Sequence, residues 1–413
     1  MRIKLENVFD IFQERGFIEQ VTGEKEVRDL LKKPTTCYVG FDPTASSLHL
    51  GSLVPIMALA HMQRTGHRPI AVVGGGTTLV GDPSGKTESR PIMKREEIDE
   101  NAIGLKEQLS RFLDFKHGKA LMVNNADWLT NLNYIEFLRD IGQFFSVNRM
   151  LSAESYRARL KTGLSFIEFN YMLLQAYDFW YLFRHYDCRL QMGGNDQWGN
   201  ILAGVDLTRR LEGEVIHCIT FPLITTSSGI KMGKTHKGTV WLDPSLTSAF
   251  DYYQYWINQD DRDIERFLAL FTFLPMDEVR RLGSLKGADI RQAKEVLAFE
   301  ATKLCHGKEE AEKAKLAAHQ LFGKAIEEFS DSVPNYSMAA GELEPGIPAY
   351  LLFEKVGLCK SRGDARRLIA QGGGYINDNR IETFDQIINT KDMMNDSILL
   401  RGGKKRYIRI ILQ

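Results

Sequence analysis

One group of residues suited to chemistry lies at the end of the strand-like run 36–41. Because side chains alternate along a strand, Tyr38, Gly40 and Asp42 fall on one face. They place a phenol, a gap and a carboxylate in line. This row suits the recognition of a small polar ligand. It also fits a core tyrosine beside a turn aspartate, so the run alone leaves both interpretations open.

A second group lies in the helix-length run 169–183, which is too apolar to face water around most of its circumference. Its polar members Tyr171, Gln175 and Asp178 are spaced i, i+4 and i+7, so they form one stripe. A buried carboxylate without partners is costly, and this stripe must therefore face hydrogen-bond donors. The stripe predicts either a structural hydrogen-bond network or a pocket for a small polar-aromatic ligand that carries an ammonium group.

Cations suited to phosphate lie in and just after the segment 81–87, which is similar to a phosphate-binding loop. The GxxxxGK[ST] pattern would need glycine where Val80 stands, and Pro83 disfavours a cradle of backbone amides. A P-loop ATPase is therefore disfavoured. Lys86 and Arg90 remain candidates for phosphate contacts from a mobile loop.

More cations lie in the segment 230–237, here called the lysine loop, which follows a run of small polar residues. That composition predicts a flexible loop. Lys231, Lys234 and Lys237 would form a movable cluster of point charges suited to polyphosphate. Lysine-rich loops are also commonly just solvated surface, so this signal is weak by itself.

The elements that would position these groups alternate between strands and helices. Strand-like runs occur at 36–41, 69–74, 119–123, 187–192 and 221–225, with helical patterns between most of them. This order predicts an α/β fold with a Rossmann-like doubly wound parallel sheet. Ligands of such sheets bind at the carboxyl ends of the strands.

The segment 42–52 joins the first strand to an apolar helix. Asp42-Pro43 ends the strand, because proline has no amide to continue the ladder. Ser46 and Ser47 are good candidates for the helix N-cap. The first amides of a helix have no internal partners, so this turn predicts an anion site.

The rest of the chain divides by pattern. Residues 5–33 have the period of an amphipathic helix, and the C-terminal unit has helices at 348–357 and 362–371 before short strands. The predicted divisions are a catalytic domain at 1–226, the lysine loop and its connection at 227–246, an all-α domain at 247–326, a linker at 327–346 and a small α+β domain at 347–413.

The overall charge is balanced, with 53 Lys+Arg and 53 Asp+Glu, but residues 346–413 carry twelve Lys/Arg against seven Asp/Glu. A basic tail on an acidic body is a mild indication of nucleic-acid binding. The five cysteines are scattered without a CxxC pair, which predicts no disulfide framework and no metal site. There is no signal-peptide pattern and no apolar run long enough for a membrane helix. We expect a cytoplasmic protein without membrane association.

Taken together, these motifs resemble the class I aminoacyl-tRNA synthetases, and among them the bacterial tyrosyl-tRNA synthetases. His49-Leu50-Gly51-Ser52 stands where the class has its HIGH motif, and Lys231 to Thr235 stands where it has KMSKS. Gly233 and Thr235 replace the two serines, while Ser52 replaces the second histidine. The tail is similar to the RNA-binding module named after ribosomal small-subunit protein S-four.

The resemblance implies a tyrosine–tRNA ligase that activates L-tyrosine with Mg-ATP to tyrosyl-adenylate and pyrophosphate. The enzyme would then transfer tyrosine to the 3′ end of tRNA(Tyr). Mg²⁺ would arrive with ATP, and the likeness implies a homodimer.

The resemblance also implies residue roles. The residues acting on the phosphates would be Thr44, His49, Lys86, Arg90, Lys231 and Lys234. The tyrosine-binding residues would be Tyr38, Gly40, Asp82, Tyr171, Gln175, Asp178 and Gln197. The remaining ATP contacts would be Asp42, Gly51, Ser52, Gly194 and Asp196, with Lys234. The tRNA contacts would be Arg157, Arg159, Lys161, Arg362, Arg366 and Arg367.

Alternatives remain at this point. The basic run at 157–161 also fits a solvated helix face. A tryptophanyl-tRNA synthetase shares the fold and both signature motifs, although the pair Tyr38 and Asp178 and the basic tail argue against it. A catalytically silent RNA-binding regulator is disfavoured by His49 and the two motif lysines. A P-loop nucleotidase is disfavoured by the shortened loop.

Overall fold

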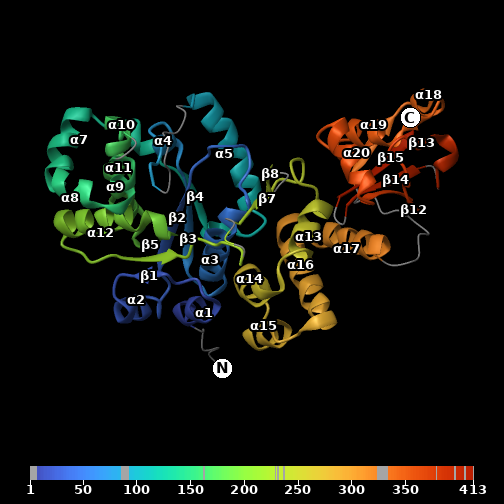
Figure 1. Cartoon of the computed structure of the whole chain (residues 1–413). Helices are drawn as coiled ribbons and strands as arrows, with labels where there is room; N and C mark the ends of the chain where they lie inside the picture. Colours follow the sequence, from blue (N-terminus) through green and yellow to red (C-terminus); the bar gives the residue numbers. More distant parts are fainter. Residues whose placement is uncertain are drawn as a thin grey trace. The chain divides into compact units, whose positions relative to one another are not determined.

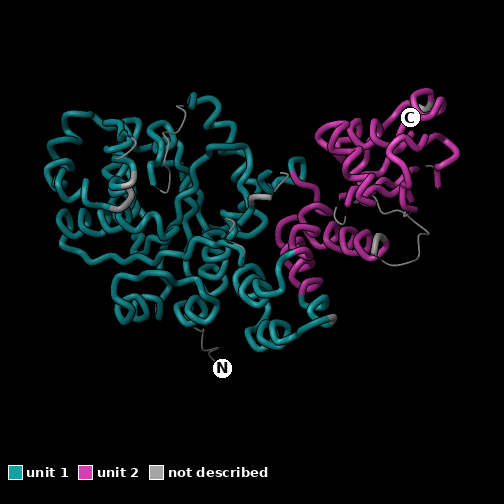
Figure 2. Tube along the Cα trace, in the orientation of Figure 1, with its two compact units in different colours: residues 1–246, 259–293 teal, residues 247–258, 294–413 magenta. Residues whose placement is uncertain are grey.

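The computed structural model of the chain is drawn in Figure 1. It describes residues 7–84, 93–160, 163–227, 229, 232–235, 238–322, 334–377, 379–394, 397–403 and 406–412. Its contacts divide into two compact units, Met1–Leu246 with Gln259–Ala293, and Thr247–Asn258 with Lys294–Gln413 (Figure 2). The finer division into five segments stays a prediction.

The first unit is built on a six-stranded sheet with the order β1-β6-β5-β2-β3-β4. The strands β2 to β6 run parallel, and β1 pairs antiparallel at one edge. After β2 the chain first builds β3 and β4 on one side, then crosses to build β5 and β6 on the other. The switch point of this doubly wound sheet therefore lies between β2 and β5. The strands are β1 Gln20–Val21, β2 Thr36–Phe41, β3 Arg68–Val73, β4 Leu121–Asn124, β5 Cys188–Gly194 and β6 His217–Phe221.

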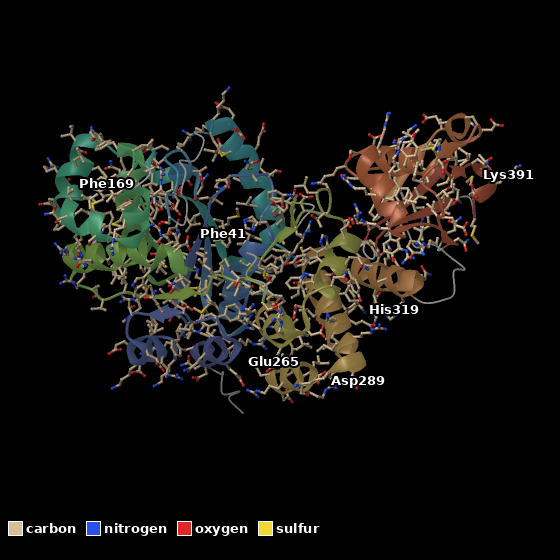
Figure 3. All side chains as sticks on the ribbon, in the orientation of Figure 1. Phe41, Phe169, Glu265, Asp289, His319 and Lys391 are labelled. Atoms are coloured by element: carbon tan, nitrogen blue, oxygen red, sulfur yellow. The ribbon has the colours of Figure 1, made fainter. Side chains whose placement is uncertain are left out.

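The predicted α/β class with a parallel sheet is confirmed. Phe41, which ends β2 just before the segment 42–52, is labelled in Figure 3. The fifth predicted strand, at 221–225, is wrong in its bounds, because β6 ends at Phe221 rather than beginning there. Pro222 follows directly, and proline cannot donate to a strand ladder.

Helices cover the sheet of the first unit. The helix expected at 5–33 is wrong, because Gly16 (φ 80°) ends the first helix and Gly23 (φ 85°) precedes the next. The helices of this unit include α1 Val8–Arg15, α2 Glu24–Leu30, α3 Leu53–Arg64, α4 Gly75–Thr78, α5 Arg95–Leu109, α6 Ala126–Leu129, α7 Tyr134–Asp140, α8 Val147–Ser152, α9 Glu154–Leu160, α10 Phe166–Phe169, α11 Tyr171–Tyr186, α12 Trp198–Glu212, α14 Ile264–Phe271 and α15 Met276–Gly283.

The second unit contains α13 Ala249–Ile257 and α17 Lys308–Phe322, and α16 Ile290–His306 crosses the boundary between the units. Its five-stranded sheet has the order β12-β11-β14-β15-β9. The strand β9, Asn335–Met338, pairs parallel to β15 and so brings part of the predicted linker into this sheet. The other elements are α18 Ala340–Leu343, β10 Ile347–Pro348, α19 Ala349–Lys355, α20 Arg362–Ala370, β11 Gly374–Ile376, β12 Asn379–Arg380, β13 Ile387–Ile388, β14 Ser397–Gly402 and β15 Arg406–Leu412.

The helices within the described ranges are all too short or too polar to cross a lipid bilayer.

Two histidines are buried in the first unit. His61 on α3 lies among the rings of Phe12, Phe17 and Phe273. Burial, helped by Arg15 and a neighbouring arginine, lowers the pKa of His61 to about 3. Burial also lowers the pKa of His67 to about 4. Both rings are therefore neutral in the folded protein at pH values where the unfolded chain is protonated.

This burial predicts acid sensitivity. Since the unfolded state binds more protons below about pH 6.5, the free energy of unfolding should fall as pH drops from 6.5 towards 4, by up to about 1.4 kcal/mol per pH unit for each histidine. Urea midpoints measured between pH 7.5 and 4.5 test this expectation. His61→Leu should flatten the slope, whereas the control His185→Gln, at an exposed position, should leave it unchanged. An unchanged slope in His61→Leu would contradict the assignment.

Candidate active site

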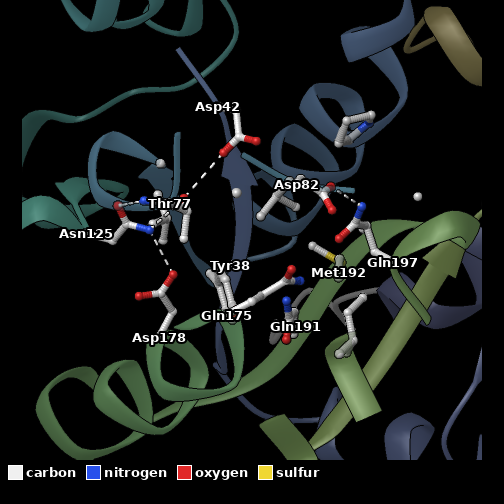
Figure 4. A pocket seen from close by; sticks show the side chains of 18 of the residues that line it. Tyr38, Asp42, Thr77, Asp82, Asn125, Gln175, Asp178, Gln191, Met192 and Gln197 are labelled. Carbon is white, nitrogen blue, oxygen red and sulfur yellow. Dashed lines mark hydrogen bonds between the residues drawn. The ribbon is translucent and has the colours of Figure 1, made fainter. Parts of the chain in front are cut away.

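A cavity of about 170 Å³ opens at the carboxyl ends of β2 and β5, at the switch point of the sheet (Figure 4). Side chains from β2, α11, β5 and the loops after β3 and β5 meet there. The structure brings together the predicted residues Tyr38, Gly40, Asp42, Asp82, Tyr171, Gln175, Asp178, Gly194 and Gln197 in its lining.

At one end of the cavity, Asp178 of α11 is buried, and its carboxylate accepts hydrogen bonds from two side chains. Its Oδ1 accepts from Trp128 Nε1 at 2.7 Å, and its Oδ2 accepts from Asn125 Nδ2 at 2.8 Å. The Tyr38 hydroxyl is also buried, and it has no hydrogen-bond partner among the described residues. A buried hydroxyl without a partner is costly. A ligand hydroxyl placed beside Tyr38 and Asp178 would satisfy both groups.

Burial raises the pKa of Asp178 to about 7, and the hydrogen bonds from Asn125 and Trp128 oppose that rise. Burial, and then the charge of Asp178, raise the pKa of Tyr38 well above its usual value. Tyr38 thus stays a hydroxyl donor at physiological pH, while Asp178 titrates within the physiological range. This end of the cavity offers one donor and one acceptor to a phenol.

Asn125 and Trp128 were not predicted from the sequence. Asn125 lies in the turn after β4, and Trp128 lies on the following helix α6. Asn125 Oδ1 also accepts from the backbone amide of Gly76 at 2.7 Å, and its Nδ2 donates to Thr77 Oγ1 at 3.0 Å. Figure 4 shows Asn125 between Thr77 and Asp178. The available signal was the pair of asparagines directly after a strand of a parallel sheet, because such positions lie at the ligand-binding edge.

The other end of the cavity collects acceptors. Asp82 is buried, its Oδ2 accepts from Gln197 Nε2 at 2.7 Å, and its Oδ1 accepts from the Ser84 amide at 2.8 Å. The Oε1 atoms of Gln175 and Gln191 are buried without partners among the described residues. A carboxylate with two amide oxygens suits an ammonium group. Gln191 was missed in the sequence, although a glutamine inside an apolar strand was its signal.

The turn after β2 differs from the prediction at its helix cap. His49, rather than Ser46 or Ser47, caps the 3₁₀ turn Leu50–Ser52 that leads into α3, because its Nδ1 accepts from the Gly51 amide at 2.9 Å. In the neutral ring, Nε2 then carries the proton and can donate to a phosphate oxygen. A Cβ at position 51 would lie 2.7 Å from His49 Cε1, so this arrangement requires glycine.

The described ATP residues Thr44, His49, Gly51, Ser52 and Asp196 lie outside the cavity lining. His49 and Thr44 are exposed, and Ser52 is half-buried at the start of α3. Asp196 Oδ2 accepts from Gln197 Nε2 at 3.2 Å, so it lies beside the acceptor end of the cavity.

The lysine loop and the residues after it are joined by backbone hydrogen bonds to the segment 48–52, here called the His49 turn. The Leu50 amide donates to Val240 O at 3.1 Å, and the Leu242 amide donates to Leu48 O at 2.9 Å. The Val240 amide in turn donates to Gly233 O at 2.9 Å. The two signature segments are therefore neighbours in space. Gly233 has a φ of 84°, which favours the glycine that stands in place of a motif serine.

Four predicted cations fall outside the part of the chain that the structure describes. Lys86, Arg90, Lys161 and Lys231 lie outside the described residues, and only the backbone of Lys234 is described, in the short strand β7 Lys234–Thr235 that pairs with β8 Gly238–Thr239.

Among the predicted tRNA contacts, Arg157 is exposed on α9. The structure differs from the prediction at Arg159, because its side chain is 3% exposed and its Nη2 donates to both Glu168 carboxylate oxygens, at 2.9 and 3.0 Å. The basic run gave no indication of this partner. Arg159 is not placed to meet a phosphate.

The arginines of the C-terminal helix α20 remain on the surface of the second unit. Arg362 pairs with Glu354 at 3.1 Å, and Arg367 pairs with Asp364. The Arg366 guanidinium lies 4.2 Å from the centre of the Tyr350 ring.

The doubly wound sheet, the cavity at its switch point and the joined signature segments define a class I aminoacyl-tRNA synthetase. Residues 30–323 match the family model described as tRNA synthetases class I (W and Y). Residues 325–410 match the model of the tyrosine–tRNA ligase SYY-like C-terminal domain.

Curated relatives agree over the full length. The tyrosine–tRNA ligase of Desulfatibacillum aliphaticivorans is 58% identical, with 98% of this chain and 99% of that protein covered. The enzyme of Caldanaerobacter subterraneus subsp. tengcongensis is 55% identical, with 98% and 100% covered. The chain belongs to the tyrosine–tRNA ligase family and is an ATP-dependent aminoacyl-tRNA ligase for tyrosine.

Solved structures have the same architecture. A C-terminally truncated mitochondrial tyrosyl-tRNA synthetase of Aspergillus nidulans is 30% identical with a TM-score of 0.70, and the match covers 77% of this chain and 94% of that one. The Archaeoglobus fulgidus enzyme complexed with L-tyrosine has a TM-score of 0.57 at 19% identity, with 75% and 100% covered, which supports the fold.

Proposed function

We propose that the cavity holds L-tyrosine with its phenol between Tyr38 and Asp178. The observation that carries this proposal is the buried Tyr38 hydroxyl, which has no hydrogen-bond partner in the described part of the chain and lines the same cavity as Asp178. The ammonium group would lie among Asp82, Tyr171 and Gln175, with Gln191 as an additional acceptor. The substrate carboxylate would lie towards Gln197.

ATP would occupy the side of the cavity that faces the His49 turn. We assign Thr44, His49, Lys86, Arg90, Lys231 and Lys234 to the phosphates, as the family likeness implies. We assign Asp42, Gly51, Ser52, Gly194 and Asp196 to the nucleoside side. Mg²⁺ would enter with ATP, bound by the phosphate oxygens.

In the proposed reaction, a carboxylate oxygen of tyrosine attacks the α-phosphorus of ATP. An O–P bond forms, the bond to the bridging oxygen breaks, and pyrophosphate leaves. A hydroxyl of the terminal tRNA ribose then attacks the tyrosyl carbonyl, and AMP leaves. The protein forms no covalent bond, so its contribution is positioning and the stabilisation of charge that develops on the phosphates.

Exchange of labelled pyrophosphate into ATP tests this assignment directly. Tyrosine should support exchange, and tryptophan and phenylalanine should not. A preference for tryptophan would overturn the pocket assignment, because an indole has no oxygen that could accept from the Tyr38 hydroxyl.

We propose a homodimer from exposed apolar side chains on α7, α9 and α10. Ile135, Leu160 and Phe166 are 69%, 49% and 70% exposed there. A second, mainly apolar cavity of about 200 Å³ lies nearby, lined in part by Phe144, Met150 and Leu202. Large apolar patches on a protein surface mark interfaces, and most soluble oligomers are symmetric homodimers. We also propose a cytoplasmic location, in keeping with five cysteines, all within the described residues, that are buried and form no disulfide.

Light scattering on the protein eluted from a size-exclusion column should therefore give the mass of two chains. The double variant Ile135→Asp with Phe166→Asp should shift this mass to one chain, because buried carboxylates would face each other across the interface. The control Leu316→Asp alters an apolar side chain that is 56% exposed on α17 and should leave the mass unchanged. A monomeric unsubstituted protein at micromolar concentration would refute the proposal.

A further inference from the structure

The start of α11 is held by a side chain from another helix. Tyr156 of α9 is fully buried, and its hydroxyl donates to Phe169 O at 2.8 Å and accepts from the Met172 amide at 3.2 Å. The first amides of a helix have no intrahelical acceptor, and the N-cap residue Asn170 supplies no side-chain cap. The Tyr156 hydroxyl therefore acts as the N-cap acceptor for α11. Phe169, whose carbonyl oxygen accepts from Tyr156, ends α10 and is labelled in Figure 3.

A buried ion pair fixes the same junction one turn further along α9. Arg159 donates to Glu168, whose Oε2 also accepts from the Ser165 hydroxyl at 2.8 Å and from the Ser165 amide at 3.1 Å. Removing one member of a buried pair leaves an uncompensated charge, so this contact resists displacement. Together the two contacts fix α10 and the first turn of α11 against α9.

The first two turns of α11 carry two of the residues that line the cavity near its acceptor end. Tyr171 is the first residue of α11, directly before the Met172 amide that Tyr156 binds, and Gln175 lies one turn later. Both line the cavity, whereas Tyr156 does not. Burial raises the pKa of Tyr156, and the nearby Asp82 carboxylate adds to the rise, so the hydroxyl keeps its proton.

We propose that Tyr156, supported by the Arg159–Glu168 pair, is a positioning residue for the ammonium subsite of tyrosine. It acts by fixing the start of α11 and therefore the places of Tyr171 and Gln175. The proposal rests on the proposed binding mode, in which the tyrosine ammonium lies at this end of the cavity.

Tyr156→Phe tests the proposal, since it removes the hydroxyl and keeps the ring. In tyrosine-dependent pyrophosphate exchange we expect the KM for tyrosine to rise about fivefold to tenfold, as for the loss of one or two hydrogen bonds, with the KM for ATP unchanged. The inhibition constant of 3-(4-hydroxyphenyl)propionate, which keeps the phenol and lacks the ammonium, should also stay unchanged. A general loss of structure would weaken both ligands equally.

Tyr253→Phe is the matched control. Tyr253 is equally buried in the second unit, and its hydroxyl has no hydrogen-bond partner among the described residues. It should leave all three constants unchanged. Glu168→Gln is a second variant that keeps the shape of the side chain and weakens the pair with Arg159, and it should raise the KM for tyrosine in the same selective way.

Two outcomes would overturn the inference. One is an unchanged KM for tyrosine in Tyr156→Phe, and the other is an equal rise in the constants of tyrosine and the propionate analogue. A failure of the proposed binding mode is distinguishable, because Asp178→Ala would then leave the tyrosine kinetics unchanged, whatever the result for Tyr156→Phe.

Discussion

Replacing Asp178 with alanine should lower kcat/KM for tyrosine in pyrophosphate exchange roughly 100-fold, the equivalent of about 3 kcal/mol. The substitution removes a charged acceptor of the substrate phenol. It also leaves the buried donors Asn125 Nδ2 and Trp128 Nε1 without the carboxylate that they now bind. Tyr38→Phe removes a single neutral hydroxyl, so it should cost only about 1 kcal/mol.

Asp178→Ala should change the selectivity for tyrosine over phenylalanine more than it changes the activity with tyrosine. A site built to bind a substrate hydroxyl rejects an analogue that lacks it, because its own polar groups are then left unpaired; tyrosine-activating enzymes are the standard illustration. Asp178→Ala should therefore bring the kcat/KM values of tyrosine and phenylalanine closer together. Equal tyrosine kinetics in Asp178→Ala and the unsubstituted protein would exclude the assigned orientation.

The pH dependence offers an independent test of Asp178. Its pKa is raised to about 7, so the carboxylate form is present above pH 7 and is lost as pH falls through 7. The KM for tyrosine should rise below pH 7, by up to about tenfold per pH unit. Asp178→Asn keeps the shape but cannot titrate, and its KM should be higher and flat over this range. Asp127→Asn, at an exposed position on the neighbouring α6, is the matched control.

The part of the site that the sequence predicted lies on two single elements. Tyr38 and Asp42 follow from the period of a strand, and Tyr171, Gln175 and Asp178 follow from the period of a helix. Each pattern is local, so it can be recognised without knowing what packs against it. The resemblance to a known class then assigned both stripes to one tyrosine site, and in the structure both stripes line one cavity.

The part that was not predicted depends on contacts between elements distant in sequence. Asn125 and Trp128 lie about 50 positions before Asp178, and no local period connects them. Arg159 was assigned to the surface because its run is basic, yet Glu168 on the next helix buries it. The His49 cap was missed because serine is the commoner cap residue. Side-chain partners of this kind become visible only with the tertiary structure.

Ending the chain at Phe322 should abolish charging of tRNA, by at least about 100-fold, while tyrosine-dependent pyrophosphate exchange remains nearly unchanged. The cavity and the His49 turn both belong to the first unit, so adenylate formation has no need of the tail. The cut belongs before Asn335 rather than at the predicted boundary near residue 346. The strand β9 pairs with β15, and a later cut would leave it without its sheet.

The reason to expect a loss of charging is electrostatic. Residues 346–413 carry twelve Lys/Arg against seven Asp/Glu. Arg362 and Arg367 are 67% and 73% exposed in their ion pairs, and exposed pairs of this kind contribute little, so phosphates can replace their partners. Each phosphate contact releases counterions, so charging by the full chain should weaken steeply with salt. Arg362→Glu with Arg367→Glu should reduce that salt dependence in the full chain without affecting exchange. An equal loss of exchange and charging in either variant would refute the division of labour between the two units.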